Sequence, residues 1–473
     1  MELNIIGREK ERSALKQYYE SNTPEFLVVY GRRRIGKTFL IREYFGGAFD
    51  FYATGLANGK KKEQLQAWND AMKSSFGTAD ANASDWLEAF RMLRLHLEKQ
   101  DETKRKVLFL DEIPWMDTHK SGFLTALEHF WNGWASGRAD IFLIICGSAT
   151  SWVVKNILKN RGGLYNRVTR RMRLLPFTLK ETEEYLKEKE IDLGRYRICE
   201  AYMIFGGVPY YYSLLGRGMS LPQNVDALCF AEDGMLRGEF EELYTSLFRH
   251  SEQYIKVVTA LSAKTKGLTR DEIIHTGSLS SGGGLTQVLE ELELCGFIRS
   301  YPNYLLDENL CLYQLADPFS LFHMRYIQGK RPRNPRYWTS NLDSPSQSTW
   351  KGYAFEQVCL HHAEQIKQAL GIMVISTEIS SWRSRQSAPG AQIDLLIDRK
   401  DGIINLCEMK YSKSIYTINA KEETQLRNRI SAFETESRTK KAVHLTMVTT
   451  YGIAKNSHAG YVQSEVVLDD LFS

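Results

Sequence analysis

The sequence has no long hydrophobic run and little excess charge of either sign. Its longest strongly apolar stretch, residues 141–146, is far shorter than the ~20 residues that a membrane-spanning helix needs. The 61 lysines and arginines and the 57 aspartates and glutamates leave a net charge of only +4, which excludes a histone-like polycation. The first residues carry charges where a signal peptide needs an apolar core. We therefore expect a soluble, cytoplasmic protein with no membrane partner, in which nucleic-acid binding is limited to local patches.

The spacing that would indicate a disulfide or zinc framework is also absent. The seven cysteines are scattered without a Cys-x-x-Cys pair, and the ten histidines show no metal-ligand spacing. Scattered cysteines are typical of reduced core residues in a cytosolic protein. His361 and His362 are adjacent on a predicted helix and face different directions, so we interpret them as surface or core residues.

A chain of 473 residues is too long for one compact domain, and its patterns divide it into five segments. Over residues 1–178, apolar runs alternate with amphipathic stretches, which predicts an α/β domain with a parallel sheet. Residues 179–249 predict a helical lid behind this sheet. Residues 250–328 carry three short helix-like stretches and a predicted hairpin, the pattern of a winged helix-turn-helix. The Pro- and Ser-rich residues 329–349 predict a linker, and residues 350–473 predict a second α/β domain.

Residues 31–38, Gly-Arg-Arg-Arg-Ile-Gly-Lys-Thr, match G-x-x-x-x-G-K-[ST] in full between an apolar strand and a helix. Backbone N–H groups of such a loop surround phosphate oxygens, and the helix N-terminus adds a positive dipole end. Lys37 is expected to reach the β- and γ-phosphates of ATP, and Thr38 to hold Mg²⁺. The expected nucleotide-binding residues of this region are Gly31, Arg32, Arg33, Arg34, Ile35, Gly36, Lys37, Thr38 and Phe39.

Two further strand ends are expected beside this loop. Asp111 ends an apolar run and is expected to hold the Mg²⁺ shell, while Glu112 is a candidate general base for the attacking water. Ser148 follows the apolar run 141–146 and is either a contact to the γ-phosphate or the water, or an ordinary turn residue. Residues 151–175 contain seven basic residues and no acid, and we select Arg167 among them as a candidate to stabilise transition-state charge in cis or across a subunit interface. A solvated basic face is the alternative.

The C-terminal segment carries a second group of charged residues on strand-like runs. Asp394 interrupts one apolar run, and Glu408 and Lys410 lie two apart on the next, so that both project from one face. If residues 400–402 form a three-residue turn with the glycine in the left-handed region, Asp394 lies opposite Glu408. Such carboxylates bind Mg²⁺ or Mn²⁺, which activates a water and neutralises a phosphodiester oxygen, and Lys410 orients or helps to deprotonate that water. Glu356, on the preceding predicted helix, is a further candidate metal ligand; chance occurrence of this short pattern without cleavage is the alternative.

DNA contacts are predicted in two places. The candidate recognition helix, residues 284–295, offers Thr286 and Gln287 to base edges, but its three glutamates suit phosphates poorly, which favours packing or oligomerisation. Residues 325–338 carry five basic residues with interleaved aromatics and no acid. A solvated linker that packs its aromatics inward explains this second stretch equally well.

Five motifs follow one another along the chain in this order: Ile6-Gly7-Arg8-Glu9, the arginine-rich P-loop, Leu110-Asp111-Glu112, Cys146-Gly147-Ser148 and Gly206-Gly207-Val208-Pro209-Tyr210. In this combination the first half of the chain resembles the archaeal/bacterial P-loop ATPases of the AAA+/STAND-like type. The resemblance implies that Gly7 and Arg8 line the adenine pocket and that the Gly-Gly-Val-Pro-Tyr element lies in the helical lid.

Residues 350–473 resemble the restriction-endonuclease-like PD-(D/E)xK fold that is often joined to this ATPase family. The resemblance is carried by Ser381-Trp382-Arg383, by Asp394 in its apolar strand, and by Glu408-Met409-Lys410. Gln392 departs from the family pattern by replacing the usual acid, and Met409 departs in the middle of the last motif. The resemblance implies that Gln425, on the following helix, lies near the metal site.

The sequence thus predicts an ATP- and Mg²⁺-dependent ATPase that acts with nucleic acid, DNA above all, and carries a nuclease-like C-terminal domain. Assembly into homo-oligomers is left open. The alternative is a STAND-like signalling switch or scaffold, in which nucleotide controls assembly and the C-terminal domain only binds. A third interpretation is an ATP-regulated transcription factor.

Overall fold

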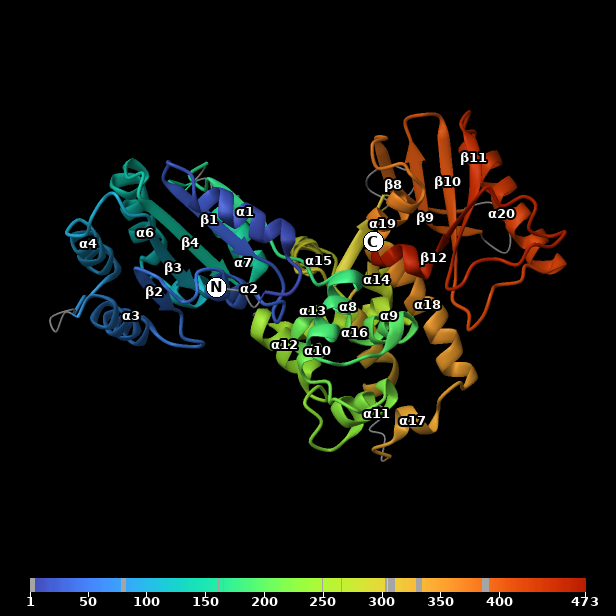
Figure 1. Ribbon diagram of the computed structural model, residues 1–473, viewed down its shortest axis with the longest axis horizontal. Coiled ribbons are helices and arrows are strands. Elements are labelled where there is room, and N and C mark those ends of the chain that lie inside the picture. The colour runs from blue at the N-terminus through green and yellow to red at the C-terminus, as the bar shows by residue number, and fades with distance from the viewer. Residues whose placement is uncertain are drawn as a thin grey trace. The chain divides into compact units, whose positions relative to one another are not determined.

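The computed structural model describes residues 5–473 apart from 78–81, 160–161, 165, 249, 265, 303, 305–310, 329–333 and 385–390. The chain divides into two compact units, Met1–Pro176 and Phe177–Ser473 (Figure 1). Among the described residues, no helix is long and apolar enough to cross a membrane. Each unit has its own five-stranded sheet.

The first unit is built on a parallel sheet of order β2-β3-β4-β1-β5, which confirms the predicted α/β class. Its strands are β1 (Glu25–Tyr30), β2 (Phe51–Thr54), β3 (Lys106–Asp111), β4 (Ile141–Gly147) and β5 (Arg170–Arg173). Every residue of β3 and β4 is buried, as expected of central strands covered on both faces. Because β4 lies between β1 and β3, the carboxyl ends of these three parallel strands lie side by side at one edge of the sheet.

Helices cover both faces of this sheet (Figure 1). They are α1 (Glu9–Tyr19), α2 (Lys37–Tyr44), α3 (Lys61–Phe76), α4 (Trp86–Leu97), α5 (Ile113–Met116), α6 (Phe123–Gly133) and α7 (Thr150–Val153), with a 3-10 turn at Ala135–Gly137 and a π-helical turn at Val154–Leu158. Alternate residues of β1 enter opposite cores. Val28 packs with Trp68 of α3 and Phe90 of α4, whereas Val29 packs with Leu15 of α1 and Ile41 of α2.

The second unit begins with the helices that the sequence predicted over residues 179–249. They are α8 (Leu179–Glu188), α9 (Gly194–Phe205), α10 (Pro209–Ser213), α11 (Leu221–Val225) and α12 (Glu239–Leu247), with a π-helical turn at Asp226–Phe230. The turn between α9 and α10 requires its second glycine, because a Cβ on Gly207 would lie 1.9 Å from the carbonyl oxygen of Phe177. His362 is a core residue, and its Nε2 accepts a hydrogen bond of 2.9 Å from the N–H of Leu179.

Three helices and a hairpin follow, in the predicted order. They are α13 (Ser251–Ala263), α14 (Arg270–Gly277), α15 (Gly283–Leu294), β6 (Ile298–Tyr301) and β7 (Leu312–Leu315). The strands β6 and β7 pair antiparallel, and Leu268 forms an isolated antiparallel bridge with Tyr313. The side chain of Thr269 caps α14 by accepting a hydrogen bond from the N–H of Glu272. We call residues 251–315 the helix–hairpin segment.

Residues 329–349, expected to form a linker or crossing segment, contain helices in the part that the structure describes. After α16 (Pro318–Phe322) and a π-helical turn at His323–Ile327, this part contains α17 (Tyr337–Ser340) and the start of α18 (Pro345–His361). The N–H groups of Trp338 and Thr339 donate to the carboxylate of Asp226 at 2.7 and 3.0 Å, and Trp338 is only 3% exposed. The polar composition reflects a helix start, because Ser344 caps α18 and a proline occupies its first turn.

This outcome also bears on the predicted basic stretch 325–338. Tyr326 and Trp338 are buried and pack edge-to-face with ring centroids 5.1 Å apart, so these aromatics point inward. Lys330, Arg331 and Arg333 lie outside the described residues. The inward-packing alternative is therefore the one that the described aromatics support.

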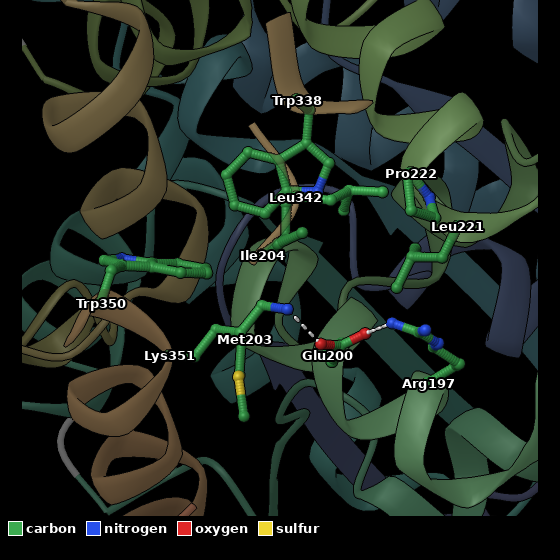
Figure 2. Close-up of a pocket in the computed structure, with 10 residues that line it drawn as sticks. All are labelled: Arg197, Glu200, Met203, Ile204, Leu221, Pro222, Trp338, Leu342, Trp350 and Lys351. Carbon is green, nitrogen blue, oxygen red and sulfur yellow. Dashed lines mark hydrogen bonds and ion pairs between the residues drawn. The ribbon is translucent and has the colours of Figure 1, made fainter. Parts of the chain in front are cut away.

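The α9 and α18 helices meet at a buried ion pair. Figure 2 shows Lys351 of α18 and Arg197 of α9 on two sides of the Glu200 carboxylate, beneath the apolar rings of Trp338 and Trp350. Glu200 and Lys351 are 5% and 7% exposed. The pair links the helices that precede the second sheet to the helix that leads into it.

The second sheet has the order β12-β11-β10-β9-β8. Its strands are β8 (Thr377–Arg383), β9 (Gln392–Arg399), β10 (Ile403–Lys410), β11 (Ala442–Thr449) and β12 (Ser464–Val467), and its further helices are α19 (Ala363–Ala369), α20 (Ala420–Ser437) and a 3-10 turn at Leu468–Phe472. Strands β8, β9 and β10 are antiparallel, whereas β10, β11 and β12 are parallel. Phe355 of α18 packs with Leu395 and Cys407, while Phe433 of α20 packs with Leu396 and Leu406 of the same two strands.

Candidate functional site

The P-loop joins β1 to α2 in the first unit and depends on two glycines. Gly31 has a φ of +148°, and a Cβ there would lie 2.2 Å from the carbonyl oxygen of Leu174. Gly36 has a φ of +84° and is the N-cap of α2. Other residues would be strained at both positions. The glycines of the motif thus let the backbone turn tightly ahead of a helix N-terminus.

Lys37 lies buried within this loop. Its Nζ donates hydrogen bonds of 2.9 Å to the Gly31 carbonyl and 2.7 Å to the Arg32 carbonyl, so that the ammonium group is held across the loop by main-chain oxygens. Arg32 and Ile35 are buried, whereas Phe39 is half exposed on the first turn of α2. Arg33 and Arg34 are partly buried, and Arg34 has a φ of 70°. This geometry places the buried Lys37 ammonium group and the buried Arg32 side chain in the loop that an anion would enter.

Thr38 and Asp111 meet across the sheet edge. The Thr38 hydroxyl donates a hydrogen bond of 2.9 Å to Asp111 Oδ2, and the Glu112 N–H donates one of 2.9 Å to Asp111 Oδ1. Burial, and then the negative charge of Glu112, raise the pKa of the Asp111 carboxyl. A divalent cation would relieve both causes, and a hydroxyl beside a carboxylate supplies the oxygen ligands that Mg²⁺ prefers. The residues present therefore fit the expected ion.

Ser148 holds the side chain of Glu112. Glu112 Oε2 accepts a hydrogen bond of 3.1 Å from the Ser148 N–H and one of 2.8 Å from its hydroxyl. Glu112 itself has a φ of 47°, in the left-handed region. The sequence placed Ser148 next to either a γ-phosphate or a water; the described contact is to the candidate base. No local signal could have shown this, because it depends on β4 lying beside β3.

The N-terminal motif lies against the P-loop. Gly7 and Arg8 have φ values of 61° and 58°, and the buried Arg8 donates a hydrogen bond of 3.5 Å to the carbonyl of Ile35. This contact agrees with a place beside the nucleotide site, although an adenine contact stays a prediction. Arg167 is exposed in a turn that its N–H closes by donating to Leu164 O at 3.1 Å. Its role as an arginine finger also stays a prediction.

The carboxylates of the second unit lie as the predicted hairpin requires. Strands β9 and β10 are joined by residues 400–402, and Gly402 has a φ of 90°. Leu395 pairs with Cys407, so that Asp394 and Glu408 occupy the next opposed positions of the antiparallel ladder. The predicted three-residue turn and register are confirmed.

Glu356 of α18 completes a group of three carboxylates. Burial, followed by the negative charges of Asp394 and Glu408, raises the pKa of Glu356 to about 8. Burial also raises the pKa of Asp394, against the lowering effect of a hydrogen bond of 2.7 Å donated by Gln392 Nε2. The three carboxyl groups therefore share one patch of low dielectric.

Two cations neutralise Glu408. Lys410 Nζ lies 2.8 Å from Glu408 Oε1, and Arg429 of α20 forms an ion pair with Glu408 Oε2. The sequence singled out Gln425, which is exposed one turn earlier on the same helix, and missed Arg429. Three carboxylates have the donor chemistry for Mg²⁺ or Mn²⁺. Within the described part of the chain, however, no three Asp, Glu, His or Cys side chains have an arrangement that could hold a metal ion.

The parallel sheet, the P-loop and the Thr38–Asp111 pair define a nucleotide-binding ATPase fold. Residues 5–215 match the family model of an ATPase domain found predominantly in Archaea. Over these residues the chain is therefore similar to P-loop ATPase domains. The match leaves residues 216–473 outside that family model.

Two similar proteins extend this comparison. An uncharacterized protein of Methanocaldococcus jannaschii, MJECL04, is 26% identical over 400 residues, which are 83% of this chain and 84% of that protein. Among solved structures, the Walker-type ATPase PABY2304 of Pyrococcus abyssi is 20% identical with a TM-score of 0.50, and the match covers 68% of this chain and 97% of that one. The second likeness shows a shared fold.

Proposed function

We propose that the chain is an ATP-hydrolysing enzyme that acts on nucleic acid and carries a metal-dependent nuclease site at Glu356, Asp394, Glu408 and Lys410. One observation carries the nuclease part: the hairpin register pairs Leu395 with Cys407, the strand neighbours of Asp394 and Glu408. Lys410 lies on the same strand face as Glu408, and Glu356 reaches the same patch from α18. Such a group is suited to phosphodiester hydrolysis with a divalent cation.

The ATPase part uses the P-loop residues in separate roles. Lys37 neutralises phosphate charge, and Thr38 and Asp111 would hold Mg²⁺, which supplies charge stabilisation at the phosphates. Glu112 takes a proton from the attacking water, and Ser148 orients the carboxylate that does so. Hydrolysis of ATP then changes the charge of the phosphates that the P-loop residues contact. This part of the proposal is supported by the family match over residues 5–215.

The second unit is proposed to combine a winged helix-turn-helix with a restriction-endonuclease-like domain. Three helices followed by an antiparallel hairpin support the first assignment. An antiparallel β8-β9-β10 meander, the crossing helix α20 and the parallel strand β11 support the second. The proposed boundaries are 1–178 for the ATPase domain, 179–249 for the lid, 250–328 for the winged helix and 350–473 for the nuclease-like domain.

In the nuclease-like site, the chemistry follows from charge. A divalent cation held by Asp394, Glu408 and Glu356 would lower the pKa of a bound water and neutralise a phosphodiester oxygen. Lys410 would orient this water or, through its positive charge, help it to lose its proton. Arg429, which pairs with Glu408 Oε2, would share that carboxylate with the cation.

Cleavage of nucleic acid tests this proposal. Plasmid, linear duplex and single-stranded DNA, and RNA, are incubated with Mg²⁺ or Mn²⁺, each with and without ATP. Cutting by the wild type that is lost in Asp394→Ala and kept in Asp401→Ala, an exposed acid of the hairpin turn, is the expected result. Normal ATP turnover without cutting of any substrate contradicts the nuclease assignment.

A second candidate function is a nucleotide-controlled switch or scaffold of the STAND-like type. It is favoured by the two cations on Glu408 and by the lack, among the described residues, of an arrangement ready for a metal ion. In this case the C-terminal domain only binds. Light scattering with ATP or a non-hydrolysable analogue would then show nucleotide-dependent assembly in a protein that never cuts.

A further inference from the structure

Gln392 connects the carboxylate patch to the helix–hairpin segment. Its Nε2 donates a hydrogen bond of 2.7 Å to Asp394 Oδ1 and one of 3.3 Å to the carbonyl oxygen of Lys266. A carboxylate at position 392 could donate neither bond. The glutamine that departs from the family pattern therefore joins the loop between α13 and α14 to the strand that carries Asp394.

The backbone fixes the position of this loop. Leu268 and Tyr313 exchange two hydrogen bonds, of 2.9 and 2.8 Å, which pin the residues that follow Lys266 to β7. Gly267 has a φ of +82°, and a Cβ there would approach Tyr313 O to 3.1 Å. Lys266 is thus an exposed residue of a tight, hydrogen-bonded turn.

The helix–hairpin segment touches the second sheet at two further points. The Tyr304 N–H donates a hydrogen bond of 2.9 Å to Ser381 O of β8, and its ring lies 5.4 Å from that of Phe433. Arg383 of β8 lies 3.9 Å from Glu272 of α14. Because backbone, aromatic and ionic contacts all cross this boundary, the loop of Lys266 has a defined place beside the sheet.

This place brings Lys266 close to the carboxylates. Its carbonyl oxygen and Asp394 Oδ1 both accept hydrogen bonds from the same Gln392 Nε2. Lys410 and Arg429, in contrast, are both committed to Glu408. Lys266 is therefore an exposed cation whose backbone is held beside Asp394 through Gln392.

A second cation of the segment lies nearby. Arg299 of β6 donates a hydrogen bond of 2.9 Å to the Tyr301 hydroxyl, and in the described part of the chain its buried Nη2 has no hydrogen-bond acceptor. The charges of Arg299 and Asp394 both act on the hydroxyls of Tyr301 and Tyr353. Arg299 thus adds a second positive charge of the segment near Asp394.

We propose that Lys266 binds a phosphate of the nucleic acid beside Asp394, so that the helix–hairpin segment completes the substrate site of the nuclease-like domain. This inference rests on the proposed function. Nucleic acids are held mainly through their phosphates, which three carboxylates alone would repel. A lysine suits this contact because its ammonium group is a point charge on a flexible stem that needs no fixed geometry.

Binding of a labelled oligonucleotide tests Lys266 directly. Fluorescence anisotropy is measured with duplex and single-stranded 20-nucleotide DNA and with RNA of the same length, in Ca²⁺ in place of Mg²⁺. We expect Lys266→Gln to raise Kd ~5–10-fold and to reduce the slope of log K against log salt by ~0.7–0.9, the loss of one phosphate contact. Lys266→Arg, which keeps the charge, restores most of the affinity. Lys256→Gln, an exposed lysine of α13, binds as the wild type does.

The outcomes separate this inference from the proposed function. Equal Kd values for Lys266→Gln and Lys256→Gln overturn the inference, even where the wild type cuts DNA. A wild type that binds but never cuts removes the nuclease assignment, while the ratio of the two Kd values still decides the role of Lys266. A wild type that binds none of the three oligonucleotides overturns the inference as well.

Discussion

Glu112 Oε2 accepts two hydrogen bonds from Ser148, one from the backbone N–H and one from the hydroxyl. The two residues are 36 positions apart and meet because β4 lies between the P-loop strand and the strand of Asp111. The serine therefore fixes the direction of the carboxylate from the end of the neighbouring strand. We expect this contact to affect the proposed base more than the binding of nucleotide.

Ser148→Ala is expected to slow ATP hydrolysis and leave nucleotide affinity unchanged. A hydrogen bond to a charged group contributes ~1.5–3 kcal/mol, and ~1.4 kcal/mol of transition-state stabilisation is tenfold in rate, so we expect kcat to fall at least ~10-fold. Steady-state ATPase kinetics and nucleotide titration give both values. Ser151→Ala, on the neighbouring α7, is the matched control. A higher kcat in Ser148→Ala would show that the serine holds Glu112 away from its task.

Lys37→Ala is expected to abolish ATP binding. The variant removes the buried ammonium group that the Gly31 and Arg32 carbonyls hold within the loop, and the phosphates lose that cation. The measurement is the increase in unfolding temperature on addition of ATP and Mg²⁺, which tight binding to the folded state produces. The wild type and Lys62→Ala, an exposed lysine of α3, should show this increase. An unchanged increase in Lys37→Ala contradicts the assignment of the nucleotide site.

Lys351→Met is expected to destabilise the second unit. It leaves the buried Glu200 carboxylate with Arg197 as its remaining ion-pair partner, and breaking a buried pair costs about 3–5 kcal/mol. At about 2–4 °C per kcal/mol for a unit of this size, the calorimetric midpoint should fall by several degrees. The double variant Glu200→Leu/Lys351→Met should recover much of the loss, because no charge stays buried without its partner. Equal midpoints for the single and double variants would contradict this account.

Glu356 is expected to make stability fall as pH rises. In the folded chain its pKa is about 8, whereas in the unfolded chain it returns to about 4.5. Between these values the folded state binds one more proton, so the free energy of unfolding decreases with increasing pH, by up to ~1.4 kcal/mol per pH unit from this group. Urea midpoints between pH 5 and 8 should therefore fall less steeply in Glu356→Gln than in the wild type. The control is Glu364→Gln, an exposed acid of α19; parallel pH profiles for all three proteins would contradict the expectation.

Local sequence patterns predicted those parts of the structure that local geometry determines. The P-loop was predictable because two glycines and a helix start lie within eight residues, and the β9–β10 register because a three-residue turn fixes it. Composition misled at residues 334–349, where serine and proline begin a helix. Arg429 and Lys266 could not be found, because each reaches the carboxylates from a separate element whose place is set by tertiary packing. The hydrogen-bond partner of Ser148 could not be predicted for the same reason, since the order of motifs along the chain does not give the order of strands in the sheet.

The arginines of β5 have a consequence for the behaviour of the chain in solution. This strand pairs with β1 along one side, and its other side is an edge of the sheet in the described structure. Its sequence is Arg-Arg-Met-Arg, with Met172 buried and Arg171 and Arg173 exposed. Exposed edge strands are templates for aggregation, and charged side chains along them oppose pairing with a second chain. The basic residues 151–175, from which we selected a candidate arginine finger, thus also include arginines that oppose edge-to-edge pairing of two chains in concentrated solution.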